Sequence, residues 1–121
     1  MNWSSFQVMG MSLLISSCSA ISTISSEERL AVLDRGKQVF DTYCASCHGL
    51  ALRGTEIGPP LIWDLYVSGH HSDRQFKKAI VQGVKQHHWR FGDMPSFKLK
   101  DEEVADVVVY VRQTLRDYGI R

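Results

Sequence analysis

The sequence predicts a small all-α domain with about four short helices. Apolar residues recur at helical spacing in three separate segments of the 121-residue chain. Helix-start signals precede two of these segments, and glycines and prolines interrupt the chain between them. No segment alternates strands with helices, and no internal repeat is present. A parallel sheet and a solenoid are therefore not indicated.

The composition is that of one ordinary globular domain. Hydrophobic residues make up 44% of the chain, charged residues make up 22%, and the formal net charge is +1. No stretch is long and apolar enough to span a bilayer. No basic tract indicates nucleic acid as a partner.

Residues 1–26 are predicted to be a secretion signal and tether, and residues 27–121 to form the domain. The signal segment has an apolar run at 8–15 and no charged side chain before Glu27, so it lacks the usual basic start. Ile15–Ser16–Ser17–Cys18 is similar to the lipobox of bacterial lipoproteins, which predicts a lipidated Cys18 followed by a Ser-rich tether at 19–26. Two alternatives stay open: ordinary cleavage after Ala20, or an apolar N-terminal helix packed on the domain.

The first predicted helix runs up to Cys44. Its apolar positions are Leu30, Leu33, Val39, Phe40 and Tyr43. A loop with three glycines and two prolines follows at 49–61.

The middle predicted helix begins with the capping-box pattern Ser72–Asp73–Arg74–Gln75. Phe76, Ala79, Ile80 and Val84 continue it at helical spacing. The segment 87–97 is expected to be irregular, since Gly92 and Pro95 interrupt it.

The last predicted helix opens on the acidic residues 101–103, which suit a positive helix N-terminus. Lys100 precedes them, so Asp101 is expected to act as the cap. Arg112 and Arg116 are expected near the negative C-terminal end. Propensity alone would allow a strand at 107–109, but the 3.6-residue spacing favours a helix. The apolar stripe comprises Val104, Val107, Val108, Val111 and Leu115.

Cys44–Ala45–Ser46–Cys47–His48 has the Cys-x-x-Cys-His spacing of c-type haem attachment. Each thiol can add to one haem vinyl group, and the adjacent imidazole can then bind the iron. A thioredoxin-like pair would need a βαβ setting, which is not indicated. A structural zinc site would need a second pair of ligands. His70–His71 is a weak candidate for that role, because adjacent histidines are expected to point in different directions.

From Leu30 to the C-terminus the sequence resembles the class I cytochromes c. Gly36 and Phe40, eight and four residues before Cys44, are similar to the family's first-helix pattern. Tyr110 resembles the aromatic residue of the last helix. The resemblance implies a small cytochrome c fold wrapped around one covalent haem, with the first and last helices crossing closely at Gly36.

The resemblance also implies roles for two loops. Gly58–Pro59–Pro60–Leu61 is similar to the family's Gly-Pro-x-Leu loop. The carbonyl of Pro59 should then accept a hydrogen bond from His48, and Leu61 should lie against the haem face. Met94, in Gly92–Asp93–Met94–Pro95, is similar to the family's second axial ligand, and His/Met ligation raises the reduction potential.

Several polar residues have less specific expected roles. Trp89, Arg53 and Arg90 are candidates to contact the haem propionates, or else an ordinary core tryptophan and surface arginines. Trp63 is assigned to packing alone. The remaining histidines are expected to form a polar haem rim, with an auxiliary copper or zinc site as the alternative. They form two pairs, His70–His71 and His87–His88.

The predicted function is one-electron transfer in a bacterial periplasmic redox chain, without catalysis of its own. The expected partners are redox proteins, docking near a cluster of cations at 77–98. The alternatives are a dedicated haem subunit of a dehydrogenase or oxidase, and a sensor or metal-handling cytochrome that uses the histidine pairs. The cations of the cluster are Lys77, Lys78, Lys85, Arg90 and Lys98, with Asp93 as the only acid.

Overall fold

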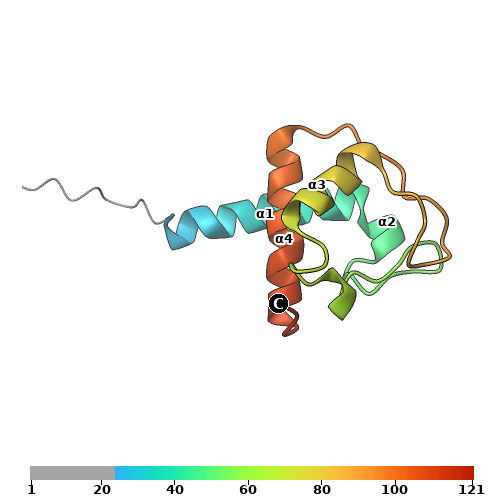
Figure 1. Cartoon of the computed structure of the whole chain (residues 1–121). Helices are drawn as coiled ribbons and strands as arrows, with labels where there is room; N and C mark the ends of the chain where they lie inside the picture. The colour runs from blue at the N-terminus through green and yellow to red at the C-terminus, as the bar shows by residue number, and fades with distance from the viewer. Residues whose placement is uncertain (1–23) are drawn as a thin grey trace, which may run out of the picture.

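The computed structural model describes residues 24–121, so the predicted signal and Cys18 lie outside the described residues. The described chain is all-α, as predicted, with one isolated bridge between Val84 and Met94 and no strand. Figure 1 shows two long helices that cross, with the shorter elements and the loops gathered on one side. None of the helices in this part of the chain has the length and apolarity of a membrane span. In chain order the elements are α1 (Ser26–Tyr43), α2 (Ala45–His48), the 3-10 helix η1 (Asp64–Tyr66), α3 (Asp73–Gln82) and α4 (Asp101–Asp117).

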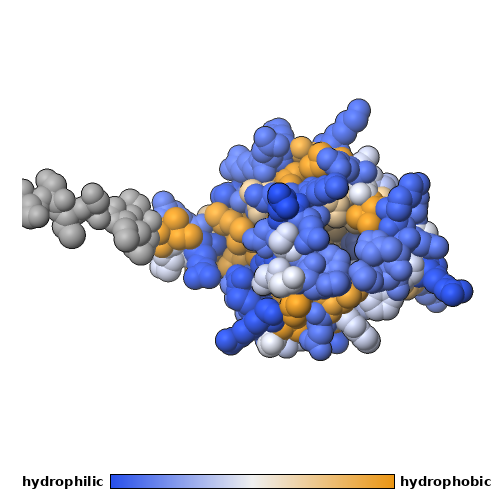
Figure 2. Space-filling model, viewed as in Figure 1, coloured by the Kyte–Doolittle hydropathy of each residue, from blue (hydrophilic) through white to orange (hydrophobic). Residues whose placement is uncertain are grey.

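Helix α1 starts within the expected tether. The backbone N–H of Glu28 donates to Ser25 Oγ (3.1 Å), and the Ser25 N–H donates back to Glu28 Oε2 (2.7 Å). This reciprocal pair satisfies two free backbone donors. Ser25 and Ser26 are therefore the cap and first residue of a helix. The first part of α1 projects from the body, and apolar side chains show along it in Figure 2.

Helices α1 and α4 cross at Gly36. A Cβ atom at Gly36 would lie 2.2 Å from the carbonyl oxygen of Asp106, so only glycine permits this separation. Phe40 and Tyr110 pack beside the crossing with ring centroids 5.6 Å apart. Arg35 Nε donates to Asp106 Oδ2 at 2.6 Å on the same contact.

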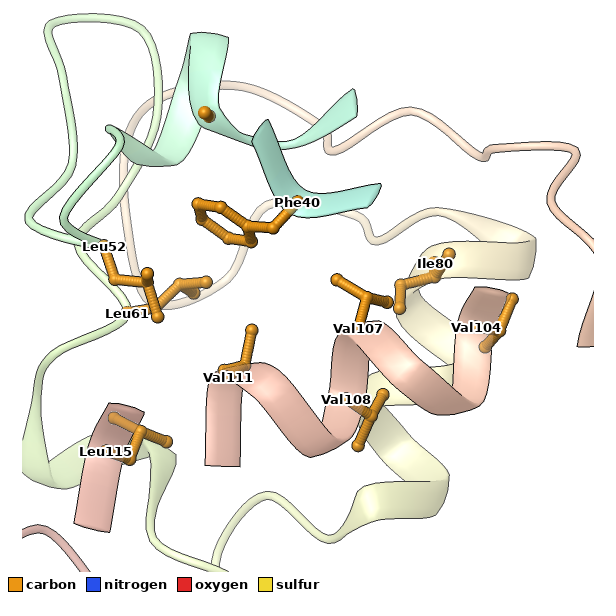
Figure 3. Close-up of a cluster of buried hydrophobic side chains, with 10 residues drawn as sticks. Phe40, Leu52, Leu61, Ile80, Val104, Val107, Val108, Val111 and Leu115 are labelled. Carbon is orange, nitrogen blue, oxygen red and sulfur yellow. The ribbon is translucent and has the colours of Figure 1, made fainter. Parts of the chain in front are cut away.

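The buried core joins α1 and α4 to the loop at 52–61 and to α3. Figure 3 shows side chains from these four segments turned toward one another. Valines at 3.6-residue spacing suit this face of a helix, and the stripe predicted for α4 is buried throughout. The buried hydrophobic residues are Phe40, Ala45, Leu52, Leu61, Ile80, Val104, Val107, Val108, Val111 and Leu115.

Helix α3 has the predicted capping box but ends earlier than expected. The Ser72 N–H donates to Gln75 Oε1 at 2.6 Å, and the Gln75 N–H donates to Ser72 Oγ at 3.4 Å. The helix ends at Gln82, because Gly83 adopts φ +74° and turns the chain. Val84, expected on this helix, lies after it, and so does Lys85.

The start of α4 also differs from the expectation. Lys100, and not Asp101, occupies the N-cap position, and its side chain makes no capping hydrogen bond. The carboxylate of Glu103 accepts from the Lys100 N–H instead (2.8 Å). An acidic residue in the first turn thus supplies one half of a capping box, while the Lys100 side chain does not supply the other half.

Candidate functional site

The described residues line a mainly apolar cavity of about 450 Å³. Protein interiors are normally packed to the density of organic crystals, so an apolar hollow of this size in a small domain indicates space for a large apolar group. Its wall includes Phe40 and Leu61 with Val107 and Val111 of α4, and also the four residues predicted to hold haem: Cys44, Cys47, His48 and Met94.

The two cysteines belong to a single helical turn, Cys44 as its cap and Cys47 within it. Cys44 ends α1 and precedes α2, with its N–H donating to the Phe40 carbonyl at 2.8 Å. Cys47 lies within α2, and both thiols are free, half-buried and on the cavity wall. Burial, with a smaller effect of Cys47, raises the pKa of the Cys44 thiol to about 11. The thiol is thus protonated and unreactive toward solvent at neutral pH.

His48 is buried and oriented by a backbone carbonyl. Its Nδ1 lies 2.8 Å from the oxygen of Pro59. Because a carbonyl can only accept, Nδ1 carries the proton and Nε2 holds the lone pair. Burial lowers the pKa of His48 despite this hydrogen bond, so the ring is neutral. A neutral, oriented imidazole is what a metal ligand requires.

The loop that carries Pro59 lies tightly against α2. A Cβ at Gly58 would lie 2.6 Å from the Cys47 carbonyl oxygen. The hydroxyl of Thr55 donates to the same carbonyl at 2.7 Å. These contacts fix the loop, and hence Pro59, relative to His48.

Met94 lies on the cavity wall, in the segment between α3 and α4. Its backbone pairs with Val84 through two hydrogen bonds of 3.0 and 2.9 Å. A Cβ at Gly83 would lie 2.6 Å from the Met94 carbonyl oxygen. The turn that ends α3 therefore fixes the backbone that presents the thioether.

The residues proposed for the propionates differ in position. Trp89 lines the cavity, and its Nε1 donates to the Tyr66 hydroxyl at 3.2 Å. Arg53 is not brought to the cavity: its guanidinium lies over the ring of Tyr118, 5.2 Å from the centroid. Stacking on the exposed ring of Tyr118 keeps the Arg53 guanidinium away from the cavity. Arg90 is exposed and is not on the cavity wall. Trp63 is more than half exposed and packs edge-on against Trp89.

The histidine pairs converge. His70, His71 and His88 each offer a ring nitrogen within 4.8 Å of the others. The expectation that adjacent histidines point apart is wrong for His70 and His71. They lie in a turn, and not in an extended strand, so both rings reach the same side.

Arg112 has a role that the sequence reasoning missed. It is buried, and it donates to Asp73 Oδ1 (2.7 Å) and to the carbonyl oxygens of Tyr66 (2.6 Å) and His71. It therefore joins α4 to the start of α3 and to the turn that carries His71. The available signal was its position four residues after Val108, on the buried face of α4.

Comparisons with known proteins relate the chain to one family. A family model described as cytochrome c matches residues 33–115, more than half of the chain. A cytochrome c-553-like protein of Synechocystis sp. is 34% identical over 79 residues, covering 65% of this chain and 66% of that protein.

Two further relatives are named as subunits of larger assemblies. The cbb3-type cytochrome c oxidase subunit FixP of Bradyrhizobium sp. is 30% identical over 114 residues, or 88% of this chain and 39% of the subunit. The cytochrome bc1 complex cytochrome c subunit of Mycobacterium leprae is 50% identical over 40 residues, or 32% of this chain and 14% of the subunit. The chain thus spans less than half the length of these two subunits.

Proposed function

Because this chain belongs to the cytochrome c family, we propose that it is a one-electron carrier of a bacterial periplasmic redox chain that uses a His/Met-ligated haem c. Proteins of this family carry covalently bound haem c, and Cys44 and Cys47 are the thiols of the attachment sequence. The observation that carries the proposal is the apolar cavity, because both thiols, a neutral imidazole and a thioether lie on its wall.

We assign His48 and Met94 as the axial ligands. When bound, haem supplies a one-electron Fe(III)/Fe(II) couple, and a soft thioether favours the ferrous state. The Pro59 carbonyl holds the proton of His48 on Nδ1 and so keeps Nε2 free to coordinate. Phe40 and the buried valines of α4 at 107, 108 and 111 give the cavity an apolar wall, and an apolar surround of this kind acts on the potential of a bound haem.

A carrier is favoured over an enzyme because two axial ligands leave no open position for a substrate. Carbon monoxide tests this point: a ferrous His/Met haem should resist the ligand, whereas an open, peroxidase-like site should bind it. Acid–acetone extraction should leave the haem on the chain. Free haem in the organic layer, or rapid binding of carbon monoxide, would contradict the proposal.

A dedicated subunit of an oxidase is the second candidate. The similarity to FixP over 88% of this chain supports it. Native electrophoresis of the detergent-solubilised host membrane distinguishes a carrier from a subunit. A carrier migrates as a free small haem protein, whereas a subunit comigrates with a large complex.

We further propose that Cys18 is lipidated and anchors the domain at a membrane. A Ser-rich stretch follows Cys18, as expected for a tether. The intact mass of the protein from its own host decides this. A chain that begins after Ala20, without lipid mass, would rule out the anchor and retain export.

A further inference from the structure

Three histidines from two separate segments meet beside the haem cavity. His70 and His71 lie in the turn after η1, and His88 lies in the irregular segment after α3. Their ring centroids are 4.7, 5.5 and 5.6 Å apart, and one ring nitrogen of each lies within 4.8 Å of the other two.

His71 is already oriented as a ligand. Its Nδ1 lies 2.8 Å from the Leu65 carbonyl oxygen, so Nδ1 carries the proton and Nε2 holds the lone pair. Arg112 donates to the carbonyl of His71 and fixes its backbone. A hydrogen bond of this kind to the non-coordinating nitrogen is typical of metal-binding histidines.

We propose that His70, His71 and His88 bind one divalent transition metal ion of the Zn²⁺ or Cu²⁺ type. Imidazole ligands suit these ions, and the cluster contains no carboxylate of the kind that Mg²⁺, Ca²⁺ or Mn²⁺ prefers. Three histidines with water in the fourth position form a complete tetrahedral zinc site.

Closure on an ion sets the separation that the three ring nitrogens have to reach. Nitrogens at ~2.0–2.1 Å from a tetrahedral zinc lie about 3.4 Å apart. His70 and His88 are exposed, so rotation of their side chains can bring their nitrogens to the fixed Nε2 of His71 without disturbing the core. His87 is adjacent but outside the cluster, and its Nδ1 contacts the Lys85 carbonyl at 2.8 Å.

The rival role for these rings is as partners of the haem carboxylates, since His71 and His88, together with His87, also line the cavity. The test is therefore a calorimetric titration of the ferric holoprotein with Zn²⁺. The site predicts one ion per chain. His70→Ala and His88→Ala should each weaken binding by on the order of 10-fold or more, through loss of a ligand. His87→Ala is the matched control and should leave the affinity unchanged.

Cu²⁺ provides a second measurement on the same variants. Its electron paramagnetic resonance spectrum should show nitrogen hyperfine structure in the wild type, and His70→Ala and His88→Ala should reduce it. Retained haem absorption and helical circular dichroism confirm that each variant is folded. A holoprotein that binds no Zn²⁺ would overturn the proposal. Equal weak binding of Zn²⁺ by the wild type and the His70→Ala/His88→Ala double variant would also overturn it, because such binding is adventitious binding at the surface. The same holds if His87→Ala loses as much Zn²⁺ affinity as His70→Ala and His88→Ala do.

Discussion

At Met94 the backbone and the side chain have separate roles. The backbone hydrogen bonds to Val84 do not depend on the side chain, so Met94→Ala should keep the loop in place. We expect the variant to lose the weak near-infrared absorption of a sulfur–iron bond and to bind carbon monoxide. Its reduction potential should fall by on the order of 0.1 V, since axial ligands set haem potentials over about 0.8 V.

Spectroscopy and a redox titration of Met94→Ala check this assignment. Val81→Ala, at an exposed position of α3, is the control and should match the wild type. If Met94→Ala retains both the band and the potential, another residue holds the sixth position.

Contacts between residues close in the sequence could be predicted. The hydrogen bond between His48 and the Pro59 carbonyl joins a helical turn to the loop that follows it, and Cys44 and Cys47 lie beside His48 on the cavity wall. Arg53 and Arg112 could not be placed in this way. Arg53 stacks on the ring of Tyr118, 65 residues later in the chain. Arg112 is held by the Asp73 carboxylate and by two backbone carbonyls in the segment before α3. Such partners are set by tertiary packing, and local patterns do not specify them.

At the level of elements, the separation of α1 and α4 depends on Gly36. Gly36→Ala would place a Cβ 2.2 Å from the Asp106 carbonyl oxygen, so the helices must move apart. We expect a loss of about 1–3 kcal/mol in the free energy of unfolding, the range for overpacked contacts. Urea denaturation of the holoprotein measures it.

Gly69→Ala is the matched control for the same chemical change. A Cβ at Gly69 would meet nothing within 4 Å, so the unfolding midpoint should not fall. Equal midpoints for the two variants would show that the crossing tolerates a methyl group.

The periodicity of apolar residues predicted which segments form helices, but it did not predict the end of α3 or the start of α4. The apolar spacing of α3 continues to Val84, yet the positive φ of Gly83 ends the helix first. At α4 Lys100 takes the cap position although its side chain makes no capping hydrogen bond, and the Glu103 carboxylate accepts a hydrogen bond from the Lys100 N–H. Helix ends depend on single backbone angles and single hydrogen bonds, so a periodic pattern locates them poorly.

For the whole molecule, the cavity implies that haem completes the core. The buried side chains of α1, α3 and α4 surround a space of about 450 Å³, and a domain this small has little other packing. We expect the apo-protein to lose much of its helical circular dichroism and its cooperative thermal transition. Expression without haem attachment, as Cys44→Ala/Cys47→Ala, provides the sample. A fully helical, cooperative apo form would contradict this expectation.

The arrangement of charge bears on how partners dock. Lys85, expected among the free cations, forms an ion pair with Asp93 at 2.5 Å. Among the five cations of the cluster at 77–98, those without an ion-pair partner in residues 24–121 are Lys77, Lys78, Arg90 and Lys98. Lys78 lies on the wall of the haem cavity, so a partner that approaches the haem there meets positive charge. Exposed charges of this kind steer association with an acidic partner and are screened by salt.

The second-order rate of electron transfer to an acidic redox partner should therefore fall steeply as ionic strength rises. Lys78→Glu should lower the rate at low salt several-fold, and high salt should remove the difference, because mutations of this type act on encounter. Arg121→Glu makes the same change of charge at the exposed C-terminus, away from the cavity wall, and should have a much smaller effect. Stopped-flow oxidation of the ferrous protein over a range of salt concentrations measures both variants. A rate that does not change with salt, or equal effects of the two reversals, would mean that apolar contact alone guides docking.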